Sequence, residues 1–357
     1  MSLSFLEIHH LRNINHTKIE PSSGLNLIYG KNASGKTSLL EGIYLLGLAR
    51  SFRSHKAGSY IQAEKQKTTL HGKLKSVTNE QITAIGFEKS LKNTELRLKG
   101  ERIKKVSEIA KVLPIQIMGP ESHSLLDSGP NMRRKFLDWG VFHVEHDYIE
   151  IWKRYRRALR QRNSALRTNP RVVSSWDSEF CETAERIDNY RREYLAELKP
   201  RFFENIAQLT SLDGLKLSYR RGWGKDNSLK EQLKMSLEKD RQTGYTARGP
   251  HRADLVLQYQ GVTVDQRLSR GQQKLVVYAL KLAQASLFDN SNQGCLVLID
   301  DLQSELDENH RNQVLQLLCK TKSQIFITAT DADSLDTGYW SEKKMFHVEH
   351  GNIQEVV

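Results

Sequence analysis

Near the N-terminus, a short apolar run leads directly into a loop that has a glycine at each end. The run Leu25–Tyr29 has the composition of a buried strand, and the loop Gly30–Thr37 fits the pattern G-x-x-x-x-G-K-[ST]. Residues 38–49 are apolar nearly all round, as in a buried helix. Glycines let backbone N–H groups turn inward, and the helix adds its positive N-terminus. The order strand, loop, helix therefore predicts a phosphate-binding loop in an α/β fold.

The groups of this loop have defined partners in a nucleoside triphosphate such as ATP. Lys36 would reach the β and γ phosphates and act in catalysis, and the Thr37 hydroxyl would hold Mg²⁺. The residues expected to bind the nucleotide are Gly30, Lys31, Asn32, Ala33, Ser34, Gly35, Lys36, Thr37 and Ser38. An ordinary glycine turn before a helix is the structural alternative, and the flanking strand and helix argue against it.

A second apolar strand, Cys295–Ile299, ends in the adjacent carboxylates Asp300 and Asp301. Carboxylate oxygens at a strand end suit Mg²⁺. We expect Asp300 to hold the metal, directly or through water, and Asp301 to orient or deprotonate the attacking water. Adjacent acids also occur in plain turns, so this interpretation depends on the phosphate-binding loop at the other end of the chain.

The segment Leu268–Gln273 precedes this strand and is predicted to open a helix capped by Ser269. A serine cap followed by glycine at a helix start can bind an anion. The residues expected to contact the nucleotide here are Ser269, Gly271 and Gln272. The alternative is a capped helix with a purely structural role.

The charge balance is basic, with 54 Lys and Arg against 42 Asp and Glu and a formal net charge of +12. Such a surface suits a polyanion such as nucleic acid, although a solvated basic surface is the plainer alternative. The segment Lys153–Arg162 has six cations and no acid, and is a candidate DNA contact. Arg53, His55 and Lys56 form a second candidate patch, which could instead touch nucleotide.

Other residue types restrict the compartment and the chemistry. Cys295 and Cys319 fall in apolar surroundings and are interpreted as buried thiols, and no C-x-x-C spacing occurs. The N-terminus does not resemble a signal peptide, and no run approaches the roughly 20 apolar residues of a membrane span. We therefore expect a cytoplasmic protein with no membrane contact. No pair of histidines joins cysteines at zinc-site spacing, and His143 and His146 are interpreted as structural.

The chain divides into segments of different pattern. Strand-like patterns occupy residues 3–29 and 66–118 and return near residue 245. The segment 132–239 is helical and strongly charged, without the sustained heptads of a coiled coil. The pattern predicts an inserted helical lobe between two strand-rich parts.

The sequence L-S-x-G-Q, lying between a distant Walker A loop and a nearby Walker B strand, resembles the signature of ABC-type ATPases. In that family the signature of one subunit covers the ATP held by the other, so ATP joins a dimer. The long interval between Gly30 and Ser269 resembles the SMC-like branch, where an arm is inserted into a split head. This resemblance implies an ABC-type P-loop ATPase head of mixed sheets plus helices, formed by 1–118 and 240–357, with a mainly helical lobe at 119–239.

Further stretches resemble the RecF family of bacterial recombination mediators. They are Phe5–Asn13, Gly47–Ser54, Arg133–Trp139 and Gly249–Leu255, and the similarity includes the overall length. The resemblance implies ATP-dependent binding of duplex and of gapped or single-stranded DNA, without sequence preference, in recombinational repair and replication restart. ATP and Mg²⁺ would be the cofactors, and a homodimer would close on DNA near single-strand gaps. RecO and RecR would be partners in loading RecA, and hydrolysis would be weak and stimulated by DNA.

The family pattern also implies roles for residues outside the loop. Gln116 lies where a Q-loop glutamine could hold the metal, and Ser304–Asp307 resembles a D-loop at the subunit interface. Two departures are visible. The Walker B strand ends in Asp-Asp, where Asp301 replaces the usual glutamate, and Thr330 follows the next strand where a switch histidine is usual. The shorter Asp301 side chain stands further from the attacking water, so slow hydrolysis is expected. Without the histidine, either another group senses the γ-phosphate or turnover is weak.

Two other function classes share part of this pattern. A motor subunit of an ABC transporter would use the same ATP chemistry but needs a membrane partner, and the long insertion and basic charge argue against it. A small-molecule P-loop kinase would use Gly30–Thr37 and leave Leu268–Gln273 without a role.

Overall fold

A computed structural model of the chain describes all residues except 55, 77–80, 225, 291–293 and 357. The chain forms two compact units, the first made of Met1–Ser122 with Lys274–Val357 and the second of His123–Gln273. Within the described part of the chain, none of the helices combines the length and the apolar character that crossing a bilayer requires.

The first unit contains an antiparallel sheet of order β2-β1-β4-β5-β6-β7. Its strands are β1 (Ser2–Leu11), β2 (Ile14–Ile19), β4 (Lys67–Lys75), β5 (Ile82–Ser90), β6 (Thr94–Leu98) and β7 (Glu101–Ile103). Buried and exposed residues alternate along β4, as expected when one face covers a core and the other meets solvent. The strands predicted within residues 3–29 and 66–118 are thus confirmed for β1, β2 and β4 to β7.

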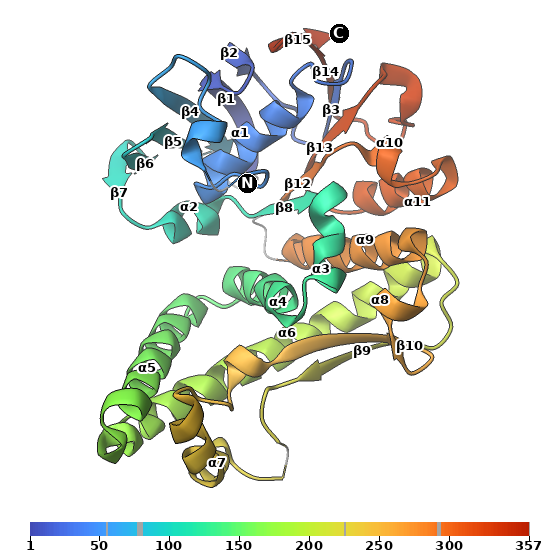
Figure 1. The fold of residues 1–357 in the computed structure, drawn as a ribbon. Coiled ribbons are helices and arrows are strands. Elements are labelled where there is room, and N and C mark those ends of the chain that lie inside the picture. Colours follow the sequence, from blue (N-terminus) through green and yellow to red (C-terminus); the bar gives the residue numbers. More distant parts are fainter. Residues whose placement is uncertain (55, 77–80, 225, 291–293, 357) are drawn as a thin grey trace. The chain divides into compact units, whose positions relative to one another are not determined.

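A second sheet of the first unit has the order β15-β14-β3-β13-β12-β8. Its strands are β3 (Leu25–Tyr29), β8 (Ile115–Met118), β12 (Leu296–Ile299), β13 (Gln324–Ala329), β14 (Lys343–Glu349) and β15 (Asn352–Val356). All neighbours pair in parallel except the terminal hairpin β14–β15. Figure 1 shows the blue β3 beside the orange and red C-terminal strands. This pairing brings both predicted halves of the nucleotide site to the carboxyl edge of one sheet.

The helix that follows β3 packs against both sheets. The helices of this unit are α1 (Lys36–Leu48), α2 (Val106–Val112), α10 (Leu302–Glu305) and α11 (Glu308–Cys319), with most of α9 (Arg270–Ser286). Two glycines allow close approach on different sides of α1. A Cβ added at Gly42 would lie 2.6 Å from Ile8 Cδ1 on β1, and one at Gly47 would overlap the side chain of Ile115 on β8. A single apolar core therefore joins the two sheets around α1.

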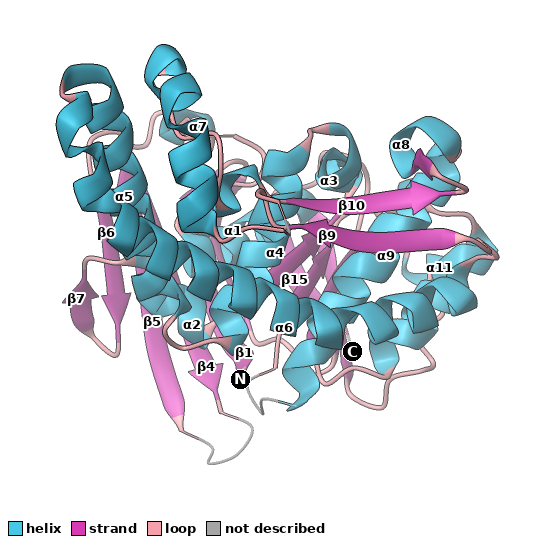
Figure 2. Ribbon diagram, turned by 90° about the horizontal axis from the view of Figure 1, so that it is seen from below, coloured by secondary structure: helices cyan, strands magenta, loops and turns pink. Residues whose placement is uncertain are grey.

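The second unit is mainly helical and contains a small antiparallel sheet of order β11-β10-β9, whose longer strands run side by side in Figure 2. The helices are α3 (Ser124–Asp127), α4 (Pro130–Val144), α5 (Tyr148–Thr168), α6 (Asp177–Leu209), α7 (Leu229–Thr243) and α8 (Val264–Arg267). The strands are β9 (Leu215–Arg220), β10 (Asp254–Tyr259) and β11 (Val262–Thr263).

Two features of this unit differ from the sequence prediction. The strand β9 interrupts the segment predicted to be helical, and the unit continues to Gln273 instead of ending at residue 239. The reason is the pairing of β10 with β9 along six residues, which holds the later segment to the earlier one. The head therefore resumes at Lys274 and not at residue 240.

In the segment Lys153–Arg162 on α5, predicted as a candidate DNA contact, some of the cations form ion pairs with acids of the same unit. Arg162 is fully buried and donates to Asp177 Oδ1 and Asp240 Oδ2, each at 2.9 Å. Arg154 forms a two-pronged pair with Glu179. Asp240 is also fully buried, so its charge has to be compensated inside the unit. Arg162 is therefore a structural residue.

The cysteine prediction is half correct. Cys295 is buried at the start of its strand, whereas Cys319 is only partly buried. Cys319 is the last residue of α11, where the helix reaches the surface.

We expect Arg162→Leu to destabilise the second unit by about 3–5 kcal/mol, because Asp240 is left buried without its cation. Arg160→Leu is the matched control, since Arg160 is exposed on the same helix, and its effect should stay within about 0.5 kcal/mol. Urea unfolding followed by tryptophan fluorescence measures both, because Trp139, Trp152, Trp176 and Trp223 all lie in this unit. Equal stability of the two variants would contradict the structural role of Arg162.

Candidate nucleotide-binding site

The loop Gly30–Thr37 joins β3 to α1 at the carboxyl edge of the parallel strands. Positive φ angles at Ala33 (64°) and Gly35 (124°) bend its backbone. Gly35 caps α1 without a side chain, and the first turn contains no acidic residue among the described positions. The first N–H groups of the helix and its positive dipole end are thus left to an external anion. This backbone conformation is compatible with the predicted phosphate-binding loop.

Asn13, in the turn between β1 and β2, supports this loop from behind. Its Nδ2 donates to Ser34 O at 2.9 Å, and its Oδ1 accepts from Ser38 Oγ at 2.9 Å. The backbone N–H of Gly351 donates to the same Ser34 oxygen at 2.8 Å. The Ser34 carbonyl therefore accepts two hydrogen bonds, one from Asn13 near the N-terminus and one from Gly351 near the C-terminus, and these hold the loop in place. Sequence reasoning included Asn13 in a family resemblance and gave it no role.

Lys36 lies folded over the loop. Its Nζ donates to the carbonyl of Gly30 and, at 2.9 Å, to that of Lys31. Burial lowers the pKa of Lys36, and the carboxylates of Asp301 and Asp300 act in the opposite direction. The ammonium is therefore close to the place where the loop would receive phosphate, within the electrostatic influence of Asp301 and Asp300.

Asp300 connects the two predicted halves of the site directly. Its Oδ1 accepts hydrogen bonds from Thr37 Oγ1 at 3.0 Å and from Thr328 Oγ1 at 2.9 Å. Burial raises the pKa of Asp300, whereas the two hydroxyl donors and the charge of Arg53 lower it. A carboxylate beside a threonine hydroxyl is an oxygen donor set of the kind Mg²⁺ takes, so these residues fit the predicted metal.

Asp301 has a left-handed backbone, with φ 55°. Its N–H donates to Thr328 Oγ1 at 2.7 Å, so the hydroxyl of one buried threonine contacts both acids of the pair. Thr328 lies on β13, the strand next to β12. Sequence reasoning missed Thr328, because threonine in a strand carries no signal of its own.

The segment after β13 contains no histidine but is held in place by a glutamine. The N–H and the hydroxyl of Thr330 contact Gln303 Oε1 at 3.1 and 2.7 Å. Gln303 belongs to α10, which also contains Ser304, the first residue of the predicted D-loop. Thr330, which occupies the position of the usual switch histidine, is thus hydrogen-bonded to the helix that follows Asp301.

Arg53 lies on a loop that a buried carboxylate organises. Glu41 on α1 is fully buried and accepts a two-pronged ion pair from Arg12, with both distances 2.8 Å. Ser51 donates to Glu41 and accepts from the N–H groups of Arg53 and Ser54, at 3.0 and 2.9 Å. Arg53 acts electrostatically on the nucleotide site, as its effect on the pKa of Asp300 shows. Lys56 is exposed, and His55 lies outside the described residues.

Gln116 does not join the metal site. It lies inside β8, in register with Val297 of β12, three residues before Asp300. At about 3.3 Å per residue, this is about 10 Å short of the strand end. The register therefore removes Gln116 from the set of metal ligands, and the turn after β8 comes near the site instead. A Cβ added at Gly119 would lie 3.3 Å from Asp300 Cβ.

The signature residues belong to the second unit and form a regular helix start. Ser269 Oγ accepts from Gln272 N at 3.3 Å, and Gln272 Oε1 accepts from Ser269 N at 3.1 Å, which is a reciprocal capping box. Ser269 and Gly271 are exposed. A Cβ added at Gly271 would meet only Ser269 Oγ, at 4.0 Å, among the described atoms. The fold of a single chain does not require glycine here.

Comparisons with known proteins give a consistent result. Residues 2–354 match the profile of the RecF/RecN/SMC N terminal domain. The chain is 44% identical to the DNA replication and repair protein RecF of Azotobacter vinelandii, over 99% of both chains. It is also 44% identical to RecF of Pseudomonas aeruginosa, over 99% of this chain and 98% of that protein.

Solved structures agree with the sequence comparison. The recombination mediator protein RecF with ATP superimposes with a TM-score of 0.86 at 28% identity, covering 100% of this chain and 98% of that one. An SMC head bound to the C-winged helix domain of ScpA superimposes with a TM-score of 0.61 at 15% identity, covering 100% and 97% of the two chains. The second similarity shows the fold alone.

We expect Asp300→Asn to raise the stability of the nucleotide-free protein by about 0.5–2 kcal/mol, the usual range for a single stabilising substitution. The folded-state pKa of Asp300 is raised, so ionising this side chain lowers the stability of the folded state. Asparagine keeps an acceptor for Thr37 and Thr328 without the charge. The gain should shrink as the pH falls through the pKa of Asp300, because the wild-type side chain then becomes neutral. Thermal unfolding without Mg²⁺ across pH measures this, and a destabilised variant would contradict it.

Proposed function

Because this chain belongs to the RecF family of DNA replication and repair proteins, we propose that it uses ATP as a switch that closes two copies of the chain on DNA. Its fold is the ABC-type ATPase head that RecF and SMC proteins share. In the proposal, Mg²⁺-ATP binds the loop Gly30–Thr37 of one copy, and the closed dimer releases DNA after hydrolysis.

The roles of the site residues follow from their positions. Lys36 exchanges its two carbonyl partners for oxygens of the β and γ phosphates. Ser38, in the first turn of α1, donates to Asn13, which supports the loop. Mg²⁺ is held by Thr37 and Asp300, whose side chains are already in contact. Asp301 acts on the attacking water, with its backbone held by Thr328. Since aspartate is one methylene shorter than glutamate, hydrolysis is slow and ATP acts as a timer.

The observation that carries the two-subunit proposal is the exposed helix start at Ser269. Its cap is complete and Gly271 has open space beside it, yet neither packs against the described part of its own chain. A helix N-terminus without a side chain at this point can approach a phosphate closely. Ser269, Gly271 and Gln272 of one copy then cover the triphosphate bound by the other.

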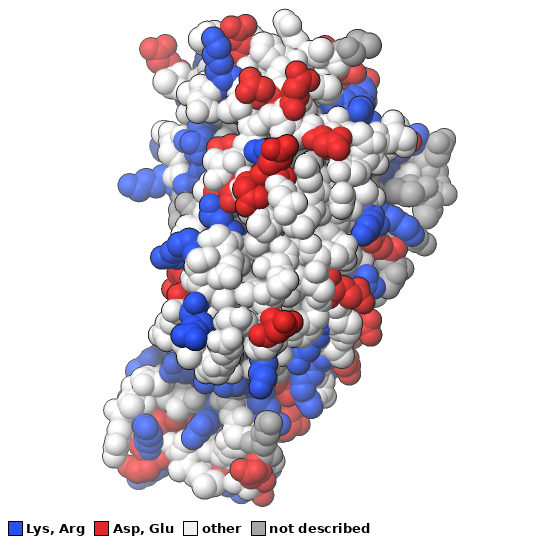
Figure 3. All heavy atoms as spheres, turned by 90° about the vertical axis from the view of Figure 1, so that its right-hand side faces the viewer, with Lys and Arg blue, Asp and Glu red and all other residues white. Residues whose placement is uncertain are grey.

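The antiparallel sheet offers a better DNA surface than α5. Residues 67–105 contain ten Lys and Arg and four Asp and Glu, which is half of the net charge of +12 in about a ninth of the chain. The exposed cations of this segment are Lys67, Lys73, Lys75, Lys92, Arg97, Lys99, Arg102, Lys104 and Lys105. On the face shown in Figure 3, by contrast, basic and acidic side chains are interspersed. Backbone phosphates of duplex or gapped DNA are the partner of the basic segment.

The remaining parts of the proposal come from the relatives. Solved RecF structures are described as belonging to the RecFOR pathway. We place this chain in the same cytoplasmic process, in which it assists RecO and RecR in loading RecA, and DNA stimulates its slow hydrolysis. No particular observation favours a transporter motor or a small-molecule kinase, since the similarity to RecF extends over the full length of the chain.

We expect subunit mixing to restore hydrolysis between two inactive variants. Lys36→Ala disables the phosphate-binding loop, and Ser269→Arg blocks the signature, so each variant alone should be inactive. In a mixed dimer, the intact loop of one copy meets the intact signature of the other. Only one of the two composite sites of a mixed dimer is intact, so the mixture should reach at most about half of the wild-type rate.

Sizing by light scattering provides the control for this experiment. The wild type should dimerise when ATP is added, and each single variant should remain monomeric. If the mixture is no more active than the separate variants, the two motifs do not act between subunits and the proposed dimer is wrong.

We expect Lys104→Gln with Lys105→Gln to weaken DNA binding and to reduce the slope of log affinity against log salt by about 2, one for each phosphate that the variant no longer neutralises. Arg157→Gln with Arg160→Gln is the matched pair on α5 and should change the slope much less. Fluorescence anisotropy of labelled duplex DNA, with ATP present and at several salt concentrations, measures both. The reverse ranking would assign the DNA surface to α5.

A further inference from the structure

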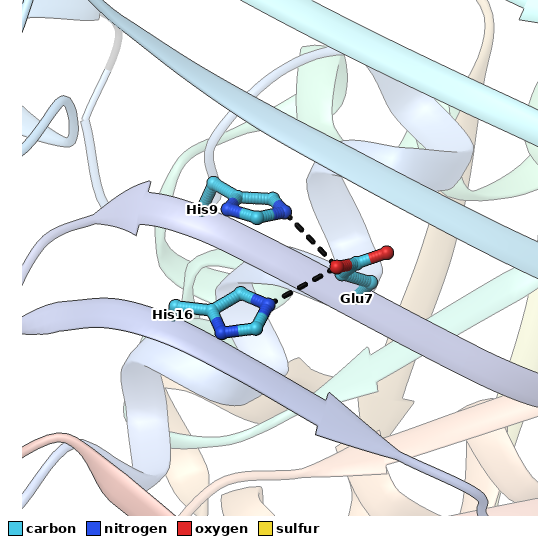
Figure 4. A group of neighbouring side chains, drawn as sticks. All are labelled: Glu7, His9 and His16. Atoms are coloured by element: carbon cyan, nitrogen blue, oxygen red, sulfur yellow. Dashed lines mark hydrogen bonds and ion pairs between the residues drawn. The ribbon is translucent and has the colours of Figure 1, made fainter.

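Two histidines and a glutamate converge on the first hairpin of the antiparallel sheet, as Figure 4 shows. Glu7 Oε1 lies 3.1 Å from His9 Nε2 and 3.0 Å from His16 Nε2. The three ligand atoms all lie within 4.8 Å of one another. Nothing in the nucleotide site or the DNA surface uses these side chains.

The strand register produces this arrangement. Glu7 and His9 are two residues apart on β1 and so point to the same face of the sheet. On β2, His16 is the direct partner of His9, and Lys18 is the direct partner of Glu7. Direct partners in an antiparallel pair have Cβ atoms about 4.5–5.5 Å apart. The two imidazole rings accordingly stack, with centroids 4.4 Å apart and planes 26° from parallel.

We propose that Glu7, His9 and His16 bind a divalent transition-metal ion of the Zn²⁺ type. Two imidazole nitrogens with one carboxylate oxygen are a ligand set of this class, and water completes the coordination. Ligands on a tetrahedral zinc lie about 3.4 Å apart, as follows from metal–ligand distances near 2.1 Å. The donor atoms therefore need only a small outward movement to receive the ion.

The surroundings of the three ligands fit an accessible site. The side chains of His9 and His16 are 36% and 46% exposed to solvent and that of Glu7 is 20% exposed, so an ion can enter from solvent. On the other side of β1, His71 of β4 stands opposite Glu7 but lies outside the group.

One neighbour opposes a cation. Lys18 Nζ lies 3.4 Å from Glu7 Oε1, where its charge competes with a metal for the same oxygen. A simple cluster of charges around Glu7 would need Lys18 as much as the histidines, whereas a metal site would gain from its removal. Lys18→Gln therefore separates the two interpretations.

The site would cross-link the hairpin that leads to the nucleotide loop. His9 and His16 form a pair near the turn, and Asn13 in that turn holds Ser34 and Ser38. A metal bridging β1 and β2 would fix this end of the hairpin. Zn²⁺ is therefore expected to raise the melting temperature of the wild type.

The experiment titrates Zn²⁺ into tag-free, chelator-treated full-length protein without nucleotide, in competition with a fluorescent zinc indicator. We expect one ion per chain at this site. His9→Ala and His16→Ala should each weaken binding at least about tenfold, in line with the cost of disturbing a metal's ligands. Lys18→Gln should tighten it. His146→Ala, which removes an exposed histidine of the second unit, is the matched control and should leave binding unchanged.

Circular dichroism verifies that each variant is folded, and Zn²⁺ should raise the melting temperature of the wild type but not that of His16→Ala. The proposal is overturned if the wild type binds no Zn²⁺ at micromolar concentrations. It is equally overturned if both histidine variants retain the wild-type affinity, because the ion would then be bound elsewhere.

Discussion

The contact of Asp300 with Thr37 is the interaction on which the nucleotide site depends. It joins the helix start after the phosphate-binding loop to the end of a strand 263 residues later in the chain. Thr328 completes it by donating to Asp300 and accepting from the backbone of Asp301, which keeps that residue in a left-handed conformation. The carboxylate is the charged member of this group, and among the described residues it has hydrogen-bond donors but no ion-pair partner. A bound divalent ion would supply the missing compensation, which is why the site is suited to Mg²⁺-ATP.

The same region shows how the core fixes the geometry of the site. Helix α1 lies between two sheets, and Gly42 and Gly47 let both sheets approach its backbone. The N-terminus of α1, with its positive dipole end, adjoins the predicted phosphate-binding loop. Further along the same helix, the buried Glu41 holds Arg12 and Ser51, and Ser51 holds the loop that contains Arg53. One helix therefore positions both loops. A shift of α1 would therefore move Thr37 and the loop that carries Arg53 together.

Sequence patterns predicted the parts of this fold that are set locally. The loop Gly30–Thr37, the cap at Ser269 and the strand before Asp300 each have a signal within about ten residues. Asn13 and Thr328 have none, because a neutral side chain acquires its role only when distant backbone is brought to it. The same reason explains the error at Gln116, which the family pattern placed near the metal and strand register removed. It also explains why the head resumes later than predicted, since this depends on the pairing of β9 with β10. The group of Glu7, His9 and His16 likewise exists only through register, since the sequence separates its members onto two strands.

The basic composition illustrates most clearly where charge counting fails. Lys153–Arg162 is the denser run of cations in the sequence, yet Arg162 and Arg154 compensate acids of their own unit, one pair in the interior and one at the surface. Across residues 67–105, by contrast, ten cations stand against four acids, and Glu95 faces both Arg97 and Arg102. A cation whose partner is buried stabilises the fold and cannot pair with a phosphate, whereas an excess of exposed cations has to be balanced by counterions. Release of the counterions condensed on DNA is what favours binding to such a surface, so the partner acids, more than the cations themselves, decide which surface binds.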